Sequence, residues 1–344
     1  MASLVITQDC ISVRSEGERL VLIKHRIDPD SAEEHMSVPL FDIDRVCVLG
    51  CPMVTMAVLH KLMRNNIPVT FLSAHGQWLG GLYSEDKRDA ARRISQYELF
   101  HDLALRQKIA ARLIYAKVRN SRRVLQRLAI PRQCTDSQEQ QKALITLRRI
   151  ARIVKERRCS LESLRGWEGM AAACYFERLN DFFPPEVPFG ERSRRPPGNA
   201  ANALLSWTYA IVQGEIDGAV RRHGLDVCIG ALHTVSHGMP SLVLDLLEPL
   251  RAPLCDMLAL HLLNHKILKQ EDFERHEDDG GTYLKTGSRK KFFQSYEQAM
   301  TRKFTLPGGA YHVDFRKVID MQVCTMLKAL QGQWSDSDDF FLMP

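Results

Sequence analysis

Short runs of β-branched and aliphatic residues alternate with turn-forming stretches over residues 3–49. The runs LVIT, CISVR, RLVLIKH and RVCVLG have the length and composition of strands, and the turn SEG at residues 15–17 separates two of them. A short helix is predicted near residues 55–64, ended before Pro68, and the strand VTFL follows it. This spacing favours a small sheet over a repeating βα fold.

Hydrophobic positions change to a period of 3.6 residues from Lys87 onward. A long helix is predicted over residues 90–128, and Ser137 opens a second, basic helix with a capping-box glutamine three residues later. Ser160 opens a third helix, and the stretch NALLSWTYAIVQGEIDGAV predicts a fourth. Residues 225–229 are the one strand-like run in this part of the chain.

The two patterns predict an α+β fold with two domains. A length of 344 residues agrees with this, because it is more than one core usually supports. Residues 1–86 are expected to form a small N-terminal β-sheet domain, and residues 87–332 a larger all-α domain. The last stretch, residues 333–344, is short and acidic, so we expect it to be disordered.

Chemical groups that suit a metal are concentrated in residues 233–251, HTVSHGMPSLVLDLLEPLR. Ser241 follows a proline and precedes an apolar run, so it is expected to cap a helix that carries Asp245 and Glu248 on one face. His233 enters from the preceding loop. Two carboxylates and an imidazole form the mixed oxygen and nitrogen site that suits Mn²⁺ or Mg²⁺ with a phosphate. A solvated amphipathic helix explains the same spacing of acids.

Glu168 is a further candidate carboxylate, in the predicted third helix LRGWEGMAAACYFERL. Gly166 and Gly169 flank it at positions where helix propensity favours larger residues, which leaves room for a ligand or another backbone. Close packing of two helices, with Glu168 exposed, also explains the glycines. The loop of residues 181–198 contains five prolines and three arginines, so we expect it to be mobile until an anion binds.

Charge is distributed unevenly along the chain, whose net charge is +6. Residues 85–165 hold 21 Lys and Arg against 9 Asp and Glu, a net charge of +12 that leaves −6 for the remainder. This segregation favours a polyanion partner such as nucleic acid, although arginine-rich helices are also often only well solvated.

Composition excludes two classes of protein. No apolar run reaches the ~20 residues that a membrane helix needs, and residues 1–8 lack a signal-peptide pattern. The chain has nine cysteines, and no two of them form a CxxC motif. This favours buried free thiols over a zinc or disulfide framework. We therefore expect a cytoplasmic protein without membrane association.

Five stretches of the chain, in order over about residues 3–330, resemble the CRISPR-associated endonuclease/integrase family of spacer acquisition. They are RNNIPVTFLSAHGQWLGGL, LRGWEGMAAACYF, NALLSWTYAIVQGE, IGALHTVSHGMPSLVLDLLEPLR and YLKTGSRKKFFQSYE. The resemblance implies an N-terminal β domain and a C-terminal helical domain with a divalent-metal site. It implies that Glu168 in GWEG, His233 in GALH and Glu248 in DLLE bind Mn²⁺ or Mg²⁺. Asp245 joins them as a nearby catalytic acid, and the spacing leaves open whether it also ligates.

The resemblance further implies a metal-dependent DNA endonuclease and integrase. Such an enzyme inserts short foreign DNA fragments as new spacers into a CRISPR array by phosphodiester transesterification, in antiviral defence. Its expected partners are double-stranded DNA (the captured fragment and the CRISPR repeat), a second copy of the chain bound through the β domain, and a small ferredoxin-like dimeric CRISPR-associated protein. The arginines expected to contact DNA phosphates are Arg119, Arg122, Arg123, Arg192, Arg194 and Arg195.

A second hypothesis comes from a different class of protein: a non-catalytic nucleic-acid-binding scaffold whose acidic cluster is structural. The presence of all three ligand types in their family contexts argues against this alternative.

Overall fold

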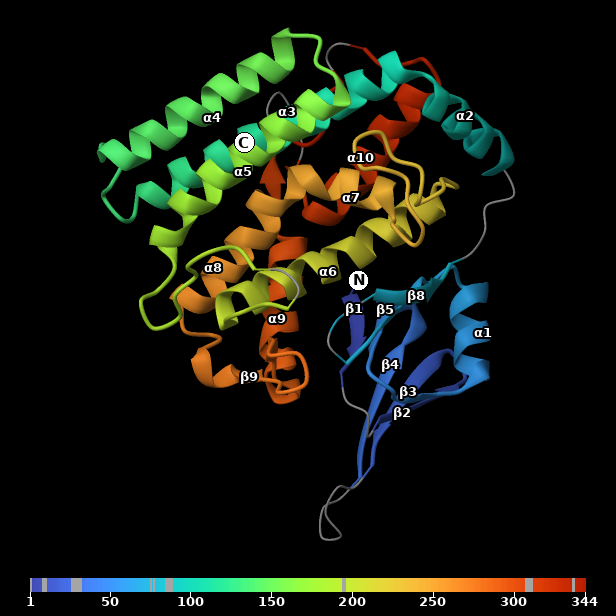
Figure 1. Ribbon diagram of the computed structural model, residues 1–344. Coiled ribbons are helices and arrows are strands. Elements are labelled where there is room, and N and C mark those ends of the chain that lie inside the picture. The colour runs from blue at the N-terminus through green and yellow to red at the C-terminus, as the bar shows by residue number, and fades with distance from the viewer. Residues whose placement is uncertain are drawn as a thin grey trace.

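The computed structural model describes residues 2–7, 11–25, 33–74, 76, 78–83, 89–193, 196–306, 312–335 and 338–344. A β-rich N-terminal region lies beside a larger helical region (Figure 1). The prediction of a mixed α+β fold is therefore confirmed. The expected domain boundary at residue 86 lies outside the described residues.

Two four-stranded sheets form the N-terminal region. Its strands are β1 (Ala2–Ile6), β2 (Ile11–Glu16), β3 (Arg19–Lys24), β4 (Glu34–Pro39), β5 (Ile43–Leu49), β6 (Met53–Val54), β7 (Val69–Leu72) and β8 (Trp78–Leu82). The first sheet has the order β1-β5-β7-β8, in which β8 alone is antiparallel to its neighbour. The second has the order β4-β3-β2-β6, and the antiparallel β2–β3 hairpin turns at Gly17, whose φ of +51° favours glycine.

Apolar side chains from both sheets form one small core. Val13 and Leu20 from the second sheet and Val69 from the first are fully buried in it. Helix α1 (Met56–Arg64) covers this core with Val58 and Leu62. β3 buries four consecutive residues and β2 two, so these strands are visible in the sequence as apolar runs.

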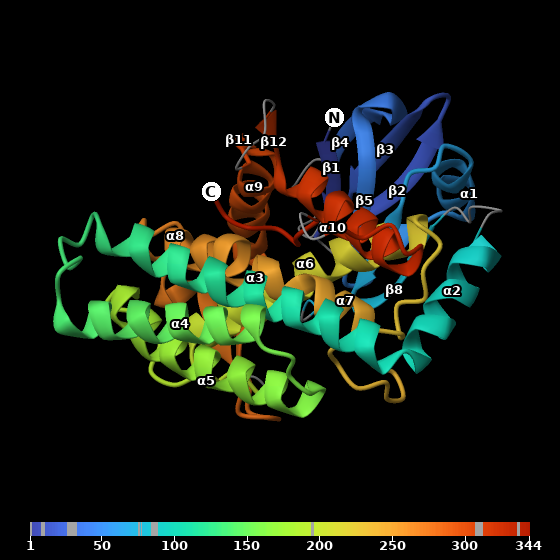
Figure 2. The ribbon, with the colours of Figure 1, turned by 90° about the horizontal axis from the view of Figure 1, so that it is seen from above.

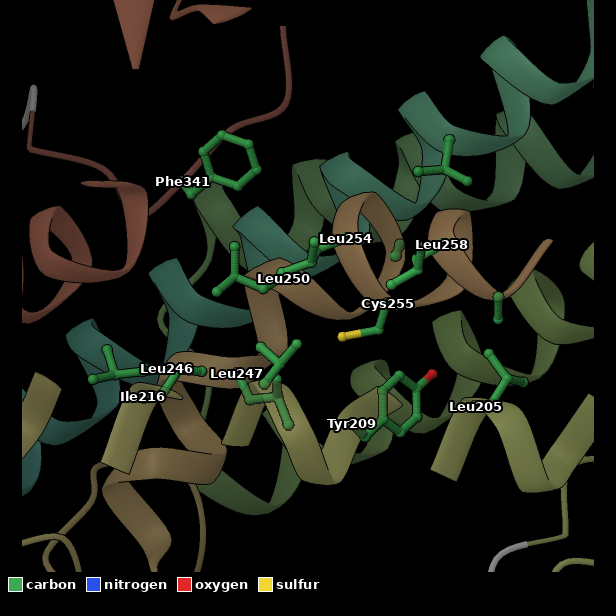
Figure 3. Close-up of a cluster of buried hydrophobic side chains, with 14 of the residues drawn as sticks. Leu205, Tyr209, Ile216, Leu246, Leu247, Leu250, Leu254, Cys255, Leu258 and Phe341 are labelled. Carbon is green, nitrogen blue, oxygen red and sulfur yellow. The ribbon is translucent and has the colours of Figure 1, made fainter. Parts of the chain in front are cut away.

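Nine helices follow in the described part of the chain. They are α2 (Asp89–His101), α3 (Leu103–Ala129), α4 (Gln138–Glu156), α5 (Leu161–Leu179), α6 (Ala200–Arg222), α7 (Ser241–Leu247), α8 (Met257–Asn264), α9 (Arg289–Thr301) and α10 (Phe315–Leu330). α3, α4 and α5 pack side by side as one layer (Figure 2). The buried helix α6 runs beneath them and contributes Leu205, Tyr209 and Ile216 to the main core (Figure 3).

Three sequence-based expectations about the helical region are wrong. The helix predicted over residues 90–128 is broken at Asp102, whose carboxylate caps α3 by accepting the N–H of Leu105 at 2.9 Å. Residues 225–229 form no strand. Two small hairpins also interrupt the helices, β9 (Phe273–Arg275) with β10 (Thr282–Leu284) and β11 (Phe304–Thr305) with β12 (His312–Val313).

The expectation that residues 333–344 are disordered is also wrong for the part that the structure describes. Phe340 and Phe341 are buried in the main core, which offsets the entropy of ordering the chain (Figure 3). The Asn120 side chain donates to the carbonyl of Phe341 at 2.8 Å and accepts the N–H of Met343 at 2.7 Å. The prediction of disorder failed because it was based on the acidic composition of the segment and not on its two buried phenylalanines.

Two further expectations concern thiols and membranes. Seven cysteines of the described residues carry free thiols, as predicted, but only Cys255 is fully buried, Cys324 is exposed and the other five are half-buried: Cys47, Cys134, Cys159, Cys174 and Cys228. Within the described residues, no helix has both the length and the apolar character needed to cross a membrane.

Candidate functional site

The segment around α7 builds one wall of the candidate site. Pro240 occupies the N-cap, so Ser241 is the first helical residue and not the predicted cap; its hydroxyl donates to the carbonyl of Thr234 at 3.0 Å. Pro249 interrupts the helix, as expected from its missing N–H. α7 ends two residues before Pro249, and after a single 3₁₀ turn the chain continues as the π-helix Arg251–Asp256.

Asp245 is fully buried and holds the loop that carries His233. Its Oδ2 accepts the backbone N–H of Ala231 at 2.6 Å and of Leu232 at 3.0 Å. Its Oδ1 accepts the backbone N–H of His233 at 3.0 Å and lies 2.6 Å from Nδ1 of the ring. Gly230 permits this approach, because a Cβ there would lie 2.6 Å from Oδ2. The carboxylate therefore fixes the imidazole through Nδ1 and leaves Nε2 facing the site.

Glu248 is the buried acid of the site, with 4% of its surface exposed. Its Oε1 accepts Nε of Arg251 at 3.0 Å and lies 3.9 Å from Nε2 of His233. Its Oε2 lies 2.6 Å from Nζ of Lys117 but makes no hydrogen bond of normal geometry. Burial alone raises the pKa of Glu248, but the two cations outweigh burial and hold the pKa at about 2. Glu248 is thus anionic at neutral pH.

Glu168 faces Glu248 from α5. Its side chain is 29% exposed, and its Oε1 contacts the Lys117 ammonium. Among the described residues, no atom of another segment lies within 4 Å of a Cβ built at Gly166 or Gly169. Close packing of another helix therefore does not explain these glycines, and the surface beside Glu168 is open.

Lys117 is the residue of this site that sequence reasoning missed. It lies on α3 between the fully buried Ala116 and Val118, and its ammonium contacts both Glu168 and Glu248. The available signal was a lysine inside the apolar run LIYAKV, where a charge is buried only if it is paired. Its place among the many basic residues of a long helix predicts a solvated side chain instead.

The structure brings Glu168, His233 and Glu248 together around Lys117. As the side chains stand, no group of three or more His, Cys, Asp or Glu residues in the described ranges forms a complete metal site. The donor types are those that suit Mn²⁺ or Mg²⁺: the Glu168 and Glu248 carboxylates share the Lys117 ammonium, which occupies a cation position, and Nε2 of His233 lies 3.9 Å from the other oxygen of Glu248. Both oxygens of Asp245 are engaged by N–H groups, so this residue acts through His233.

A second buried carboxyl group, Asp256, lies behind the site. Its two oxygens accept the hydroxyls of Tyr175 at 2.9 Å and Tyr209 at 2.6 Å. Burial raises the pKa of Asp256 to about 6, against the lowering effect of these hydrogen bonds and of nearby arginines. A cavity of about 20 Å³ lies here, and Lys117 and Asp256 both line it.

The predicted DNA-contacting arginines divide into three groups. Arg119 and Arg123 are exposed on α3, whereas the half-buried Arg122 donates to the carbonyl of Leu144 at 3.3 Å. Arg192 is not on a mobile loop, because it donates to Asn202 at 2.9 Å and to Ser206 at 3.1 Å. The other two, Arg194 and Arg195, lie outside the described residues.

A basic groove, which sequence reasoning did not locate, runs between α3 and the end of α4. Its volume is about 960 Å³. Its lining includes the charged and aromatic side chains Lys108, Arg112, Tyr115, Lys155 and Arg158. On the outer surface of α4, Arg149 and Arg152 are exposed as well. Most of the positive charge of residues 85–165 is thus presented by two neighbouring helices (Figure 2).

Comparison with known proteins yields one family and several similar folds. The family described as "CRISPR associated protein Cas1" matches residues 4–298. The chain is 32% identical over 295 residues to the CRISPR-associated endonuclease Cas1 3 of Thermus thermophilus, covering 86% of this chain and 85% of that protein.

Two solved structures share the fold. A casposase bound to integration product has a TM-score of 0.84 at 23% identity, covering 99% of this chain and 93% of that one. A Cas6-RT-Cas1–Cas2 complex has a TM-score of 0.79 at 22% identity, covering 100% of this chain and 36% of that one. At these identities the likeness is one of fold.

Proposed function

This chain belongs to the CRISPR-associated Cas1 family, and from that premise we propose that it is a divalent-metal-dependent DNA endonuclease and integrase. It inserts short foreign DNA fragments as new spacers into a CRISPR array by phosphodiester transesterification, in the cytoplasm and as part of antiviral defence. The relative from Thermus thermophilus is named an endonuclease, and the similar casposase structure is bound to an integration product.

The observation that carries this proposal is the convergence of Glu168, His233 and Glu248 from three separate segments. His233 presents Nε2 because Asp245 holds Nδ1, and Glu248 is kept anionic by two cations. A bound Mn²⁺ or Mg²⁺ polarises a phosphate and lowers the pKa of an attacking hydroxyl. A structural acidic cluster has no need of an imidazole oriented in this way.

The chain's own residues account for the remaining requirements of strand transfer. Transesterification forms one phosphorus–oxygen bond as another breaks, and the proton of the attacking hydroxyl passes to the leaving oxygen or to water. Glu168 is the most exposed carboxylate of the site, so it is placed to meet the incoming DNA. Arg251, beside Glu248, contributes a positive charge that offsets the developing charge on the phosphate.

We assign DNA binding to the basic surface of α3 and α4. Exposed arginines there bind the sugar–phosphate backbone without reading sequence, and the groove between the helices has one aromatic side chain, Tyr115, among its cations.

The proposal includes two protein partners. A second copy binds through the N-terminal β region, where five large apolar side chains are more than 60% exposed: Met36, Phe41, Met53, Met56 and Leu79. The second partner is a small ferredoxin-like dimeric CRISPR-associated protein. The similar solved structure of a Cas1–Cas2 complex supports this partner. Light scattering at micromolar concentration that shows only a monomer would count against the dimer.

The test is integration of a duplex oligonucleotide into a plasmid that carries a CRISPR repeat, with Mn²⁺ present. His233→Ala should abolish strand transfer, because it removes the imidazole but leaves a half-buried position with little packing to lose. The matched control is His237→Ala, an exposed histidine in the same loop, which should retain full activity. His237→Ala should melt at the wild-type temperature, whereas His233→Ala should remain folded but melt lower, because buried Asp245 loses one of its four contacts.

Glu168→Ala should behave like His233→Ala. Glu248→Ala is a poorer probe, because the buried Glu248 balances Lys117 and Arg251 and its loss destabilises the fold. If His233→Ala integrates DNA as well as the wild type does, the site assignment is wrong. If the wild type binds DNA but never cleaves or joins it under any divalent ion, the scaffold alternative is correct.

A further inference from the structure

Lys117 makes a contact that the proposed reaction does not explain. Its ammonium touches Glu168 on α5 and Glu248 after α7, two acids that are 80 residues apart in the sequence. The Lys117 side chain is only 14% exposed, and it is the sole hydrogen-bonding or ion-pairing partner recorded for Glu168 within the described residues. The lysine is therefore the bridge that holds the two carboxylates together.

The charges of the cluster show why this bridge matters. Glu168 and Glu248 are balanced by Lys117 and Arg251, so the cluster is neutral without any metal. A divalent ion on the same carboxylates, with the ammonium still in contact, would leave an excess of two positive charges in a largely buried site. The ammonium contacts Oε1 of Glu168 and Oε2 of Glu248, so it occupies the space between the two carboxylates that would hold the ion.

We infer that Lys117 is an internal counter-ion, which occupies the cation position of the resting site and is displaced when a divalent ion binds. This inference rests on the proposed function, because it takes Glu168 and Glu248 as metal ligands. The lysine keeps the two acids from repelling each other, and from repelling DNA, while no ion is bound. The lysine also lowers the affinity of the site for a divalent ion, because its ion pairs with Glu168 and Glu248 must break before the ion binds.

The displaced ammonium has a polar place to occupy. The cavity behind the site holds about 20 Å³, which is about the size of one water molecule, and Lys117 lines its wall. Asp256 lines the same cavity together with the hydroxyl-bearing rings of Tyr175 and Tyr209. Most of the remaining lining is apolar and Arg251 also belongs to it, so Asp256 and the two hydroxyls are the groups there that can receive the ammonium.

The experiment measures Mn²⁺ affinity of the full-length protein without DNA, by titration calorimetry or by the electron paramagnetic resonance of free Mn²⁺. Lys117→Met has nearly the same shape without the charge, so it should bind Mn²⁺ roughly tenfold more tightly than the wild type. The metal-free variant should melt at a lower temperature, and Mn²⁺ should raise its melting temperature more than that of the wild type.

Two further variants make the result specific. Lys142→Met removes an exposed lysine from the neighbouring helix α4 and should leave both readouts unchanged. Lys117→Arg keeps the charge and forms paired hydrogen bonds with carboxylates, so it should bind Mn²⁺ no more tightly than the wild type. If Lys117→Met does not fold, Lys117→Arg still tests the inference, because tighter Mn²⁺ binding by Lys117→Arg would overturn it.

The two proposals fail in distinguishable ways. If the wild type binds Mn²⁺, His233→Ala does not, and Lys117→Met binds it equally or more weakly, then the metal site stands and the counter-ion inference is overturned. If neither the wild type nor Lys117→Met shows saturable binding, the metal-dependent function itself fails. In that case Lys117 is a permanent structural bridge, and the inference falls with it.

Discussion

Replacing Asp245 by asparagine tests how the structure orients His233. The change keeps the size and shape of the side chain but replaces one oxygen by an NH₂ group. In the structure Oδ2 accepts two backbone N–H groups, and Oδ1 accepts a third and faces Nδ1 of His233. An NH₂ group in place of Oδ2 leaves two backbone N–H groups without an acceptor, whereas in place of Oδ1 it leaves one backbone N–H without an acceptor and forces Nδ1 of His233 to accept.

The expected cost follows from these four contacts. A hydrogen bond to a charged acceptor contributes about 1.5–3 kcal/mol, and Asp245 is fully buried, so water does not replace the lost partners. Losing two such bonds, as replacement of Oδ2 does, should lower the free energy of unfolding by roughly 3–6 kcal/mol. If the NH₂ group replaces Oδ1, the imidazole accepts at Nδ1 and carries its proton on Nε2, the nitrogen that faces Glu248.

The assay combines urea unfolding of the metal-free protein with Mn²⁺ titration. Asp245→Asn should lose stability by the amount above, and Mn²⁺ affinity should fall by about 10–100-fold, as expected when the group that orients a histidine ligand is lost. Asp278→Asn is the control, because Asp278 is exposed and the same chemical change there should alter neither quantity. Wild-type stability together with wild-type Mn²⁺ affinity in Asp245→Asn would refute the assigned role.

Three further predictions follow from the structure. As pH rises from 3.8 to about 6, Asp256 by itself should lower the free energy of unfolding by about 3 kcal/mol, because folded Asp256 keeps its proton longer than the unfolded chain does. The difference between wild type and Asp256→Asn in a pH series of urea unfolding curves measures this contribution. Removing Arg149 and Arg152 together should weaken binding of all duplexes alike and flatten the salt dependence by about two units in fluorescence anisotropy, and an unchanged slope would place the DNA elsewhere. Phe341→Ala should cost about 3–5 kcal/mol in urea unfolding, whereas a freely disordered tail would cost nothing.

Much of the fold could be predicted from the sequence because its signals are local. The strands before residue 83, the helices from residue 89 onward and the caps at Ser137 and Ser160 appear in the structure as expected. The break at Asp102 was missed because the hydrophobic period continues across it, so only the cap contact reveals it. The hairpins have strands of two or three residues, which are too short to show a period.

Less of the site than of the fold could be predicted from the sequence. Motif resemblance selected Glu168, His233 and Glu248, and the structure brings them together. The roles of the neighbouring residues Asp245 and Lys117 depend on contacts between segments that are distant in the sequence, so the sequence did not show them. Spacing along α7 left the role of Asp245 open, and only the loop of residues 231–233 folding back onto it shows that its oxygens are engaged. Lys117 reaches the site from α3, which no local pattern connects with α5 or α7.

These contacts divide the site into a fixed half and an adjustable half. On the fixed side, fully buried Asp245 ties His233 to α7 through four contacts, so a change there costs stability as well as function. On the adjustable side, Glu168 lies between two glycines that face open space and is held through Lys117. Little packing opposes movement of the Glu168 side chain. This side of the site, on α5, is therefore the one that adapts to an ion or a phosphate. Variants of Asp245 should therefore change stability and affinity together, whereas variants of Glu168 should change metal and DNA binding with little loss of stability.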